Sequence, residues 1–203
     1  MVTVERLQVP FSDEVACDVN AFENALMAEL DPETPPYPVA LTKAYAEHHD
    51  PQEETEVYAA RAGDGGVAGV AWMSANVVEN QHLAFADFAV APRYRRQGVG
   101  AKLLASYVAF AEKYDRSTLL LGAKLRHDAG AAFAESLGAQ VGMQAHVNRL
   151  LLSDLPDGLI DGWLANDTTD YELEWVPDSD RPDTWLADLA VVTDVLVNDA
   201  PME

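Results

Sequence analysis

A basic, glycine-containing stretch at residues 95–100, RRQGVG, separates an apolar segment that ends at Val90 from a long amphipathic segment. The two glycines let the backbone approach an anion closely, and consecutive amides can turn toward one point. If the amphipathic segment is a helix, its unpaired N–H groups and the positive end of its dipole face the same point. The sequence therefore predicts a binding site for a phosphate group, formed by the main chain of Arg95, Arg96, Gln97, Gly98, Val99, Gly100 and Ala101.

Two other phosphate-binding motifs fit this stretch poorly. In a nucleotide-binding P-loop the lysine is followed by Ser or Thr, whereas Lys102 is followed by Leu103. A dinucleotide-binding turn has its first glycine directly after the strand, whereas Pro92 and several basic or aromatic residues intervene here. A helix start that binds no ligand is the remaining alternative.

The stretch resembles the acyl-coenzyme A signature of the GCN5-related N-acetyltransferase (GNAT) family, Arg/Gln-x-x-Gly-x-Gly/Ala, at Arg95, Gly98 and Gly100. The preceding strand, Pro92 and the following helix come in the family's order. The resemblance covers about residues 1–152 and implies an α/β (mixed α+β) fold, a mostly antiparallel sheet with helices on both faces. It also implies transfer of an acetyl group from acetyl-CoA to a primary amine of a small molecule or peptide.

The resemblance assigns roles to the strand before the signature. In the family, the fourth strand splays from the fifth, and the pantetheine arm of coenzyme A lies in the gap; this maps to the main chain of Phe88, Ala89 and Val90. An N–H group of Val90 or its neighbour would stabilise the oxyanion. Asp87 is the candidate general base, and the alternative for it is a carboxylate that bonds a neighbouring strand or faces solvent.

The chain departs from the family at the proton donor for the leaving thiolate. The family commonly has a tyrosine four residues before a glycine, and counting back from Gly138 places Ala134 there. His127, at the position of a family asparagine, either replaces that acid, binds the pantetheine arm or caps a helix. The alternative function is a catalytically weakened coenzyme A-binding or interaction module whose activity depends on a missing second domain. A structural domain that binds no cofactor is a third possibility.

Hydrophobic periodicity predicts the elements that position these residues. Strands are expected at residues 2–9, 56–61, 67–78, 82–90, 117–125 and 141–152. Helices are expected at residues 13–30, 39–48, 98–114 and 128–137. The segment 117–125 is almost wholly apolar, which is typical of a central strand buried on both faces.

The end of the chain resembles its beginning. A strand-like segment closed by Val-Pro, then a turn and a helix, occurs at residues 4–30 and again from Tyr171 onward. We therefore expect an N-acetyltransferase domain at residues 1–152, a linker at 153–170, and the first strand and helix of an incomplete second repeat at 171–203. The alternative for the last segment is an independent appendage. The tryptophan side chains of this segment are expected to be buried, either against the first domain or in a homodimer.

Composition limits the classes of partner. With 34 acidic and 13 basic residues the formal net charge is −21, which repels nucleic acid and anionic membranes. No apolar run is long enough to span a bilayer, and the N-terminus does not resemble a secretory signal. A single cysteine, Cys17, rules out an internal disulfide and a cysteine-rich zinc site, and no metal site is predicted. These features predict a cytoplasmic protein.

Overall fold

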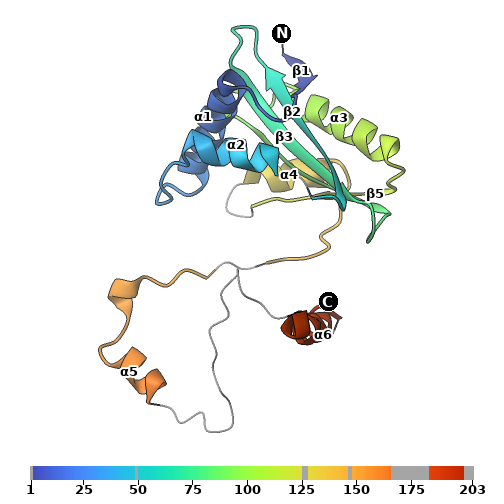
Figure 1. Cartoon of the computed structure of the whole chain (residues 1–203). Coiled ribbons are helices and arrows are strands. Elements are labelled where there is room, and N and C mark those ends of the chain that lie inside the picture. Colours follow the sequence, from blue (N-terminus) through green and yellow to red (C-terminus); the bar gives the residue numbers. More distant parts are fainter. Residues whose placement is uncertain (1, 49, 125–127, 146–147, 166–182, 199–203) are drawn as a thin grey trace. The chain divides into compact units, whose positions relative to one another are not determined.

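The computed structural model describes residues 2–48, 50–124, 128–145, 148–165 and 183–198, and the chain divides into two units, Met1–Ala139 and Gln140–Glu203 (Figure 1). The first unit contains a five-stranded sheet. Its strands are β1 (Thr3–Arg6), β2 (Glu53–Arg61), β3 (Val67–Asn76), β4 (Leu83–Val90) and β5 (Thr118–Leu121), in that spatial order. The first four are antiparallel neighbours, and β5 pairs parallel with β4. The predicted mixed, mostly antiparallel sheet is confirmed.

Helices cover both faces of this sheet (Figure 1). Helices α1 (Asp13–Leu30) and α2 (Val39–Glu47) lie on one face, and α3 (Val99–Lys113) lies on the other. The start of α1 is fixed by Ser12, whose Oγ accepts a hydrogen bond from the Val15 N–H at 3.3 Å, a typical N-cap. Helix α1 places Val19 and Phe22 among the buried side chains of this face.

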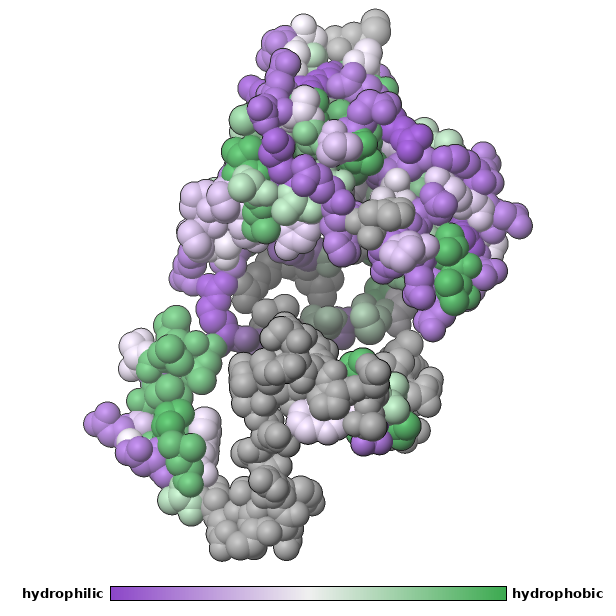
Figure 2. Space-filling view, viewed as in Figure 1, coloured by the Kyte–Doolittle hydropathy of each residue, from purple (hydrophilic) through white to green (hydrophobic). Residues whose placement is uncertain are grey.

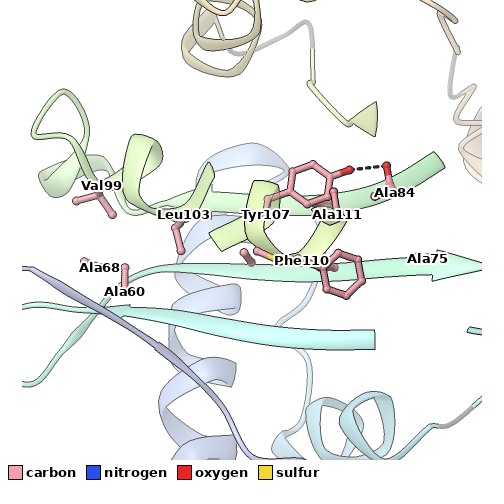
Figure 3. Packing of buried hydrophobic residues seen from close by; sticks show 12 residues of the cluster. Ala60, Ala68, Ala75, Ala84, Val99, Leu103, Tyr107, Phe110 and Ala111 are labelled. Carbon is pink, nitrogen blue, oxygen red and sulfur yellow. Dashed lines mark hydrogen bonds between the residues drawn. The ribbon is translucent and has the colours of Figure 1, made fainter. Parts of the chain in front are cut away.

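The face beneath α3 is lined by small side chains. Leu103, Tyr107 and Phe110 of α3 are buried against a set of alanines from β2, β3 and β4 (Figure 3). Because alanine adds only one methyl group to the sheet surface, large side chains of the helix fill the layer and α3 lies close to the strands. This layer fixes the start of α3 relative to the end of β4.

Two predictions about the far side of the sheet are wrong. Strand β5 is short, and among the described residues it is the last strand of the sheet, with Leu120 39% exposed. The strand predicted at residues 141–152 should have covered this side, but its described residues contain no strand, and Val141 is 88% exposed. An alternating apolar pattern forms a strand only where a neighbour pairs with it. Helix α4 (Asp128–Ser136) follows β5 as predicted.

The second unit contains the short helix α5 (Leu159–Leu164) and the helix α6 (Asp183–Asn198). Hydrophobic side chains gather along α5, where Trp163 and Leu164 are exposed (Figure 2). Residues 171–182, which hold the predicted first strand of a second repeat, lie outside the described residues, so the repeat stays a prediction. None of the helices within the described ranges is long and apolar enough to cross a membrane.

Candidate active site

The loop between β4 and α3 presents its amides at one end of the helix. Arg96 and Gly98 both have left-handed backbone angles, with φ of 59° and 79°, a conformation that turns successive N–H groups toward one side. The first backbone hydrogen bond of α3 runs from Lys102 N–H to Gly98 O at 3.1 Å. The amides of residues 96–101 donate to no backbone carbonyl within the described chain. They form a set of free donors at the positive end of the helix dipole.

The two signature glycines serve different purposes. Gly98 needs its left-handed conformation, which costs an ordinary L-residue about 1–2 kcal/mol. Gly100 has an ordinary helical position, but a Cβ there would lie 3.4 Å from Cε2 of the Phe133 ring on α4. The absence of a side chain at both positions leaves the donor amides open and lets α4 approach the start of α3.

The basic side chains of this loop are less free than the sequence indicates. The Arg95 guanidinium pairs with both carboxylate oxygens of Glu29 at 2.7 and 2.6 Å, and its Nε donates to Val90 O at 3.0 Å. Arg95 therefore ties the end of α1 to the end of β4. Lys102 donates to a main-chain carbonyl near the N-terminus. Arg96 is exposed and makes no ion pair with any described residue, so its charge is available to a ligand.

Beyond Ala86, β4 and β5 no longer pair. Their parallel register begins at Leu83↔Thr118 and ends at Ala86↔Leu121, whereas β4 continues beside β3 to Val90. The remaining residues of β4 have no strand on their other side within the described chain. Within the described ranges, the last four residues of β4 therefore have no paired strand on one side, directly before the loop with free amides, and we call this break in the strand pairing the gap.

The hydrogen-bond pattern decides which main-chain groups face this gap. Ala91 N–H donates to Ala68 O near the start of β3 at 2.9 Å. Because facing directions alternate along an antiparallel strand, the N–H and C=O groups of Ala89 also point toward β3. Those of Phe88 and Val90 point into the gap. Of the three residues predicted to hold a ligand through their main chain, Phe88 and Val90 have the required direction and Ala89 does not.

A small cavity of about 40 Å³ lies in the gap. Phe133 narrows it by packing edge-to-face on Phe88, with ring centroids 5.7 Å apart. The space holds only a few water-sized groups, so a larger group needs the Phe133 ring to move. The lining residues are Ala86, Phe88, Leu121, Gly122, Ala123, Gly130, Phe133 and Ala134.

Asp87 lies at the mouth of the gap. Its side chain is exposed, and Oδ1 is 3.0 Å from the position that a Cβ on Gly122 would take. Because Gly122 has no side chain, the carboxylate can lean across the end of β5. Ala134 lines the cavity without a polar group, and His127 lies outside the described residues. In the described part of the chain no group of three or more His, Cys, Asp or Glu side chains could hold a metal ion.

A second carboxylate, that of Glu23, lies near this strand, and no motif in the sequence indicates it. Trp72 pairs with Asp87 in the β3–β4 register, and its Nε1 donates to Glu23 Oε1 at 3.0 Å. Thr42 donates to the other oxygen of Glu23 at 3.4 Å. Burial raises the pKa of Glu23, although both hydrogen bonds lower it in part. Its position along α1 could have indicated that it faces the sheet, because Glu23 follows the buried Val19 by one helical turn.

The comparisons with known proteins agree on one family and one fold. A family model described as the acetyltransferase (GNAT) family matches residues 20–139, more than half of the chain. No curated protein is significantly similar to the chain. A solved tandem GNAT protein from the clavulanic acid biosynthesis pathway is 25% identical with a TM-score of 0.57. That match covers 68% of this chain and 43% of the tandem protein, so this chain spans less than half of its length.

Two more distant structures share the fold. A ribosomal-protein-alanine N-acetyltransferase from Brucella melitensis biovar Abortus 2308 is 19% identical with a TM-score of 0.56, over 74% of this chain and 99% of that protein. An aminoglycoside acetyltransferase from an uncultured soil metagenomic sample, solved with sisomicin, is 18% identical with a TM-score of 0.53. That match covers 74% of this chain and 96% of the other.

Proposed function

The chain belongs to the acetyltransferase (GNAT) family, and we propose that it transfers an acetyl or other acyl group from acyl-CoA to a primary amine of a small molecule or peptide. The observation that carries this proposal is the gap beside Phe88 and Val90, which opens directly next to the free amides of residues 96–101. The acceptor class rests on likeness alone. The two distant structures are named for a protein alanine and an aminoglycoside.

The start of α3 would hold the diphosphate of coenzyme A. Its free N–H groups match the phosphate oxygens in chemistry, and the helix dipole favours the negative charge. The missing side chains at Gly98 and Gly100 leave room for close approach, and Arg96 adds a free positive charge. Arg95 acts indirectly, because its ion pair with Glu29 holds the loop against α1.

The acyl donor supplies an activated thioester when bound, and the protein supplies orientation and charge stabilisation. Placing the two reactants side by side can lower the barrier by about 7–11 kcal/mol. The Val90 N–H, which faces the gap, can donate to an oxyanion there, a contribution of about 3 kcal/mol. Asp87 at the mouth of the gap would take a proton from the amine, directly or through a water molecule.

Among the described residues that line the site, no side chain is placed to donate a proton to the leaving thiolate. Ala134 lines the cavity at the position where the family commonly has a tyrosine. Protonation of the thiolate would then come from water. This observation favours the second candidate function, a module that binds coenzyme A with little or no acyl transfer.

Ala134→Tyr is therefore expected to raise kcat about tenfold, below the 10²–10⁴-fold range of well-placed acid catalysts because the cavity was not shaped for the ring. The measurement is thiol release with the best amine found for the wild type. Ala134→Phe is the matched control, since it adds the same ring without a hydroxyl. Equal kcat for the tyrosine and phenylalanine variants would contradict a missing acid at this position.

Calorimetry with acetyl-CoA, followed by thiol release across a panel of amines, tests the proposal. Binding together with rapid release in the presence of one amine supports acyl transfer. Binding with only slow hydrolysis, whatever the amine, would instead support the coenzyme A-binding module. No binding, with an unchanged melting temperature at excess acetyl-CoA, would exclude both.

We also propose that the protein works in the cytoplasm and that it self-associates. The free, exposed Cys17 suits a reducing cytoplasm. The exposed Trp163 and Leu164 of α5 support self-association through the C-terminal segment.

A further inference from the structure

Two large apolar side chains, Phe85 of β4 and Leu120 of β5, lie exposed next to each other on the sheet. They are register partners in the parallel pair, and they are 42% and 39% exposed. Side chains alternate between the two faces along a strand, and Ala84, Ala86 and Leu121 pack in the layer beneath α3. Phe85 and Leu120 therefore lie on the opposite face, which α1 and α2 cover over β2 and β3.

The candidate base shares this face with the apolar pair. Asp87 follows Phe85 by two residues on β4, and both are exposed, so their side chains lie on the same face about 7 Å apart along the strand. Within the described ranges Asp87 makes no ion pair. The surface beside the gap thus combines one unpaired negative charge with exposed apolar side chains.

The other neighbours of Asp87 on this face are less open. Ala89, the next residue of β4 on the same face, packs against the layer beneath α1. Trp72, the register partner of Asp87 on β3, also packs against that layer, and its Nε1 already donates to a carboxylate of α1. Among the described residues, the large apolar side chains that lie exposed around Asp87 are those of Phe85 and Leu120.

We propose that Phe85 and Leu120 determine acceptor specificity, and that the acceptor is a small amine with an apolar alkyl or arylalkyl group. This inference rests on the proposed function, because only that function brings an amine to Asp87. The ammonium group is attracted to Asp87, which takes its proton. The nitrogen then bonds to the acyl carbon, the carbon–sulfur bond breaks, and water protonates the thiolate. Meanwhile the apolar group covers Phe85 and Leu120, which releases water from both surfaces.

Three amines of equal length test the inference, because hexylamine, 5-amino-1-pentanol and 1,5-diaminopentane differ only in a terminal methyl, hydroxyl or ammonium group. With the wild type and acetyl-CoA, thiol release should give hexylamine a kcat/KM about tenfold above that of 5-amino-1-pentanol, the low end for one apolar contact. The difference should lie in KM, because this contact is remote from the reacting nitrogen. Phe85→Ala should reduce the preference to about twofold, and Leu120→Ala should reduce it by a smaller factor.

Val108→Ala is the matched control, since Val108 is also 39% exposed but lies on α3, on the other face of the sheet. It should leave the preference for hexylamine unchanged. Calorimetry should give the same affinity for acetyl-CoA in all three variants, which checks that they fold. If Phe85→Ala does not fold, the reduced preference of Leu120→Ala decides the matter.

The outcomes separate this inference from the proposed function. Equal kcat/KM for hexylamine and 5-amino-1-pentanol, a preference for 1,5-diaminopentane, or turnover confined to other amines overturns the apolar acceptor and leaves acyl transfer standing. An unchanged preference in the folded Phe85→Ala and Leu120→Ala variants overturns the role of the two side chains. Binding of acetyl-CoA without thiol release for any primary amine overturns the proposed function and this inference with it.

Discussion

Gly98→Asp is expected to weaken acetyl-CoA binding by at least about a hundredfold, because it places a carboxylate among the amides that would hold the diphosphate. Gly98 is the N-cap of α3, and aspartate is a favoured N-cap residue. The new side chain can accept hydrogen bonds from the first amides of the helix and repel the phosphates. A Cβ at Gly98 meets no atom within 4 Å, so the variant should fold, with a left-handed backbone strain of about 1–2 kcal/mol. Calorimetry with acetyl-CoA measures the loss.

Gly98→Asn separates the charge from the backbone strain. Asparagine has the same size as aspartate and tolerates the left-handed conformation of Gly98. It also competes for the amides but carries no charge, so its affinity for acetyl-CoA should fall only about tenfold, a smaller loss than the charged residue produces. The melting temperatures of the two variants control for strain. Wild-type affinity in the aspartate variant would mean that these amides do not hold the diphosphate.

The local pattern of the sequence was sufficient to predict the loop at the start of α3. Glycine at position 98 indicates a backbone that turns where other residues are strained, and the structure has φ of 79° there. The stripe of Leu103 and Tyr107 predicts a helix packed on a sheet, and both side chains are buried. Such features depend on residues a few positions apart, so the order of strands and helices up to α4 could be predicted.

The partners of side chains could not be predicted in the same way. Arg95 lies in the basic stretch that was expected to bind a phosphate, but its side chain pairs with Glu29, 66 residues earlier in the chain. Nothing in the sequence around Arg95 indicates that pair, because it depends on where α1 ends over the sheet. The same limit applies to the Tyr107 hydroxyl, because its contacts with the main chain of Ala84 and Leu120 depend on how α3 lies over β4 and β5.

The outer side of the sheet shows a limit of hydrophobic patterns. The apolar run of β5 predicted burial on both faces, and the alternation after Val141 predicted a strand. Both patterns describe what a segment could bury, not whether a neighbour is present to bury it. In the described residues the neighbour is absent, and Leu120 and Val141 are exposed. In the described residues, no strand pairs with the end of β4 on the side where the acyl donor would lie.

Asp87→Asn is expected to lower kcat/KM for acyl transfer about a hundredfold, the lower end of the range for loss of a general base. An alkylamine is almost fully protonated at neutral pH, because the reference pKa of a lysine-type amine is about 10.4. The attacking nitrogen must lose that proton, and the exposed carboxylate at the mouth of the gap can accept it. Asparagine keeps the shape and cannot accept the proton. Affinity for acetyl-CoA should stay unchanged, because no donor amide of the loop is altered.

Asp115→Asn provides the matched control, with the same change at an exposed position after the far end of α3. Its kcat/KM should equal that of the wild type. Raising the pH from about 7 to about 9 increases the free amine roughly a hundredfold. The Asp87→Asn variant should therefore recover relative to the wild type, since solvent then does the work of the missing base. An unchanged kcat/KM at neutral pH would show that Asp87 only faces solvent at the edge of the gap. A loss that does not recover at high pH would assign the carboxylate to holding the amine rather than to taking its proton.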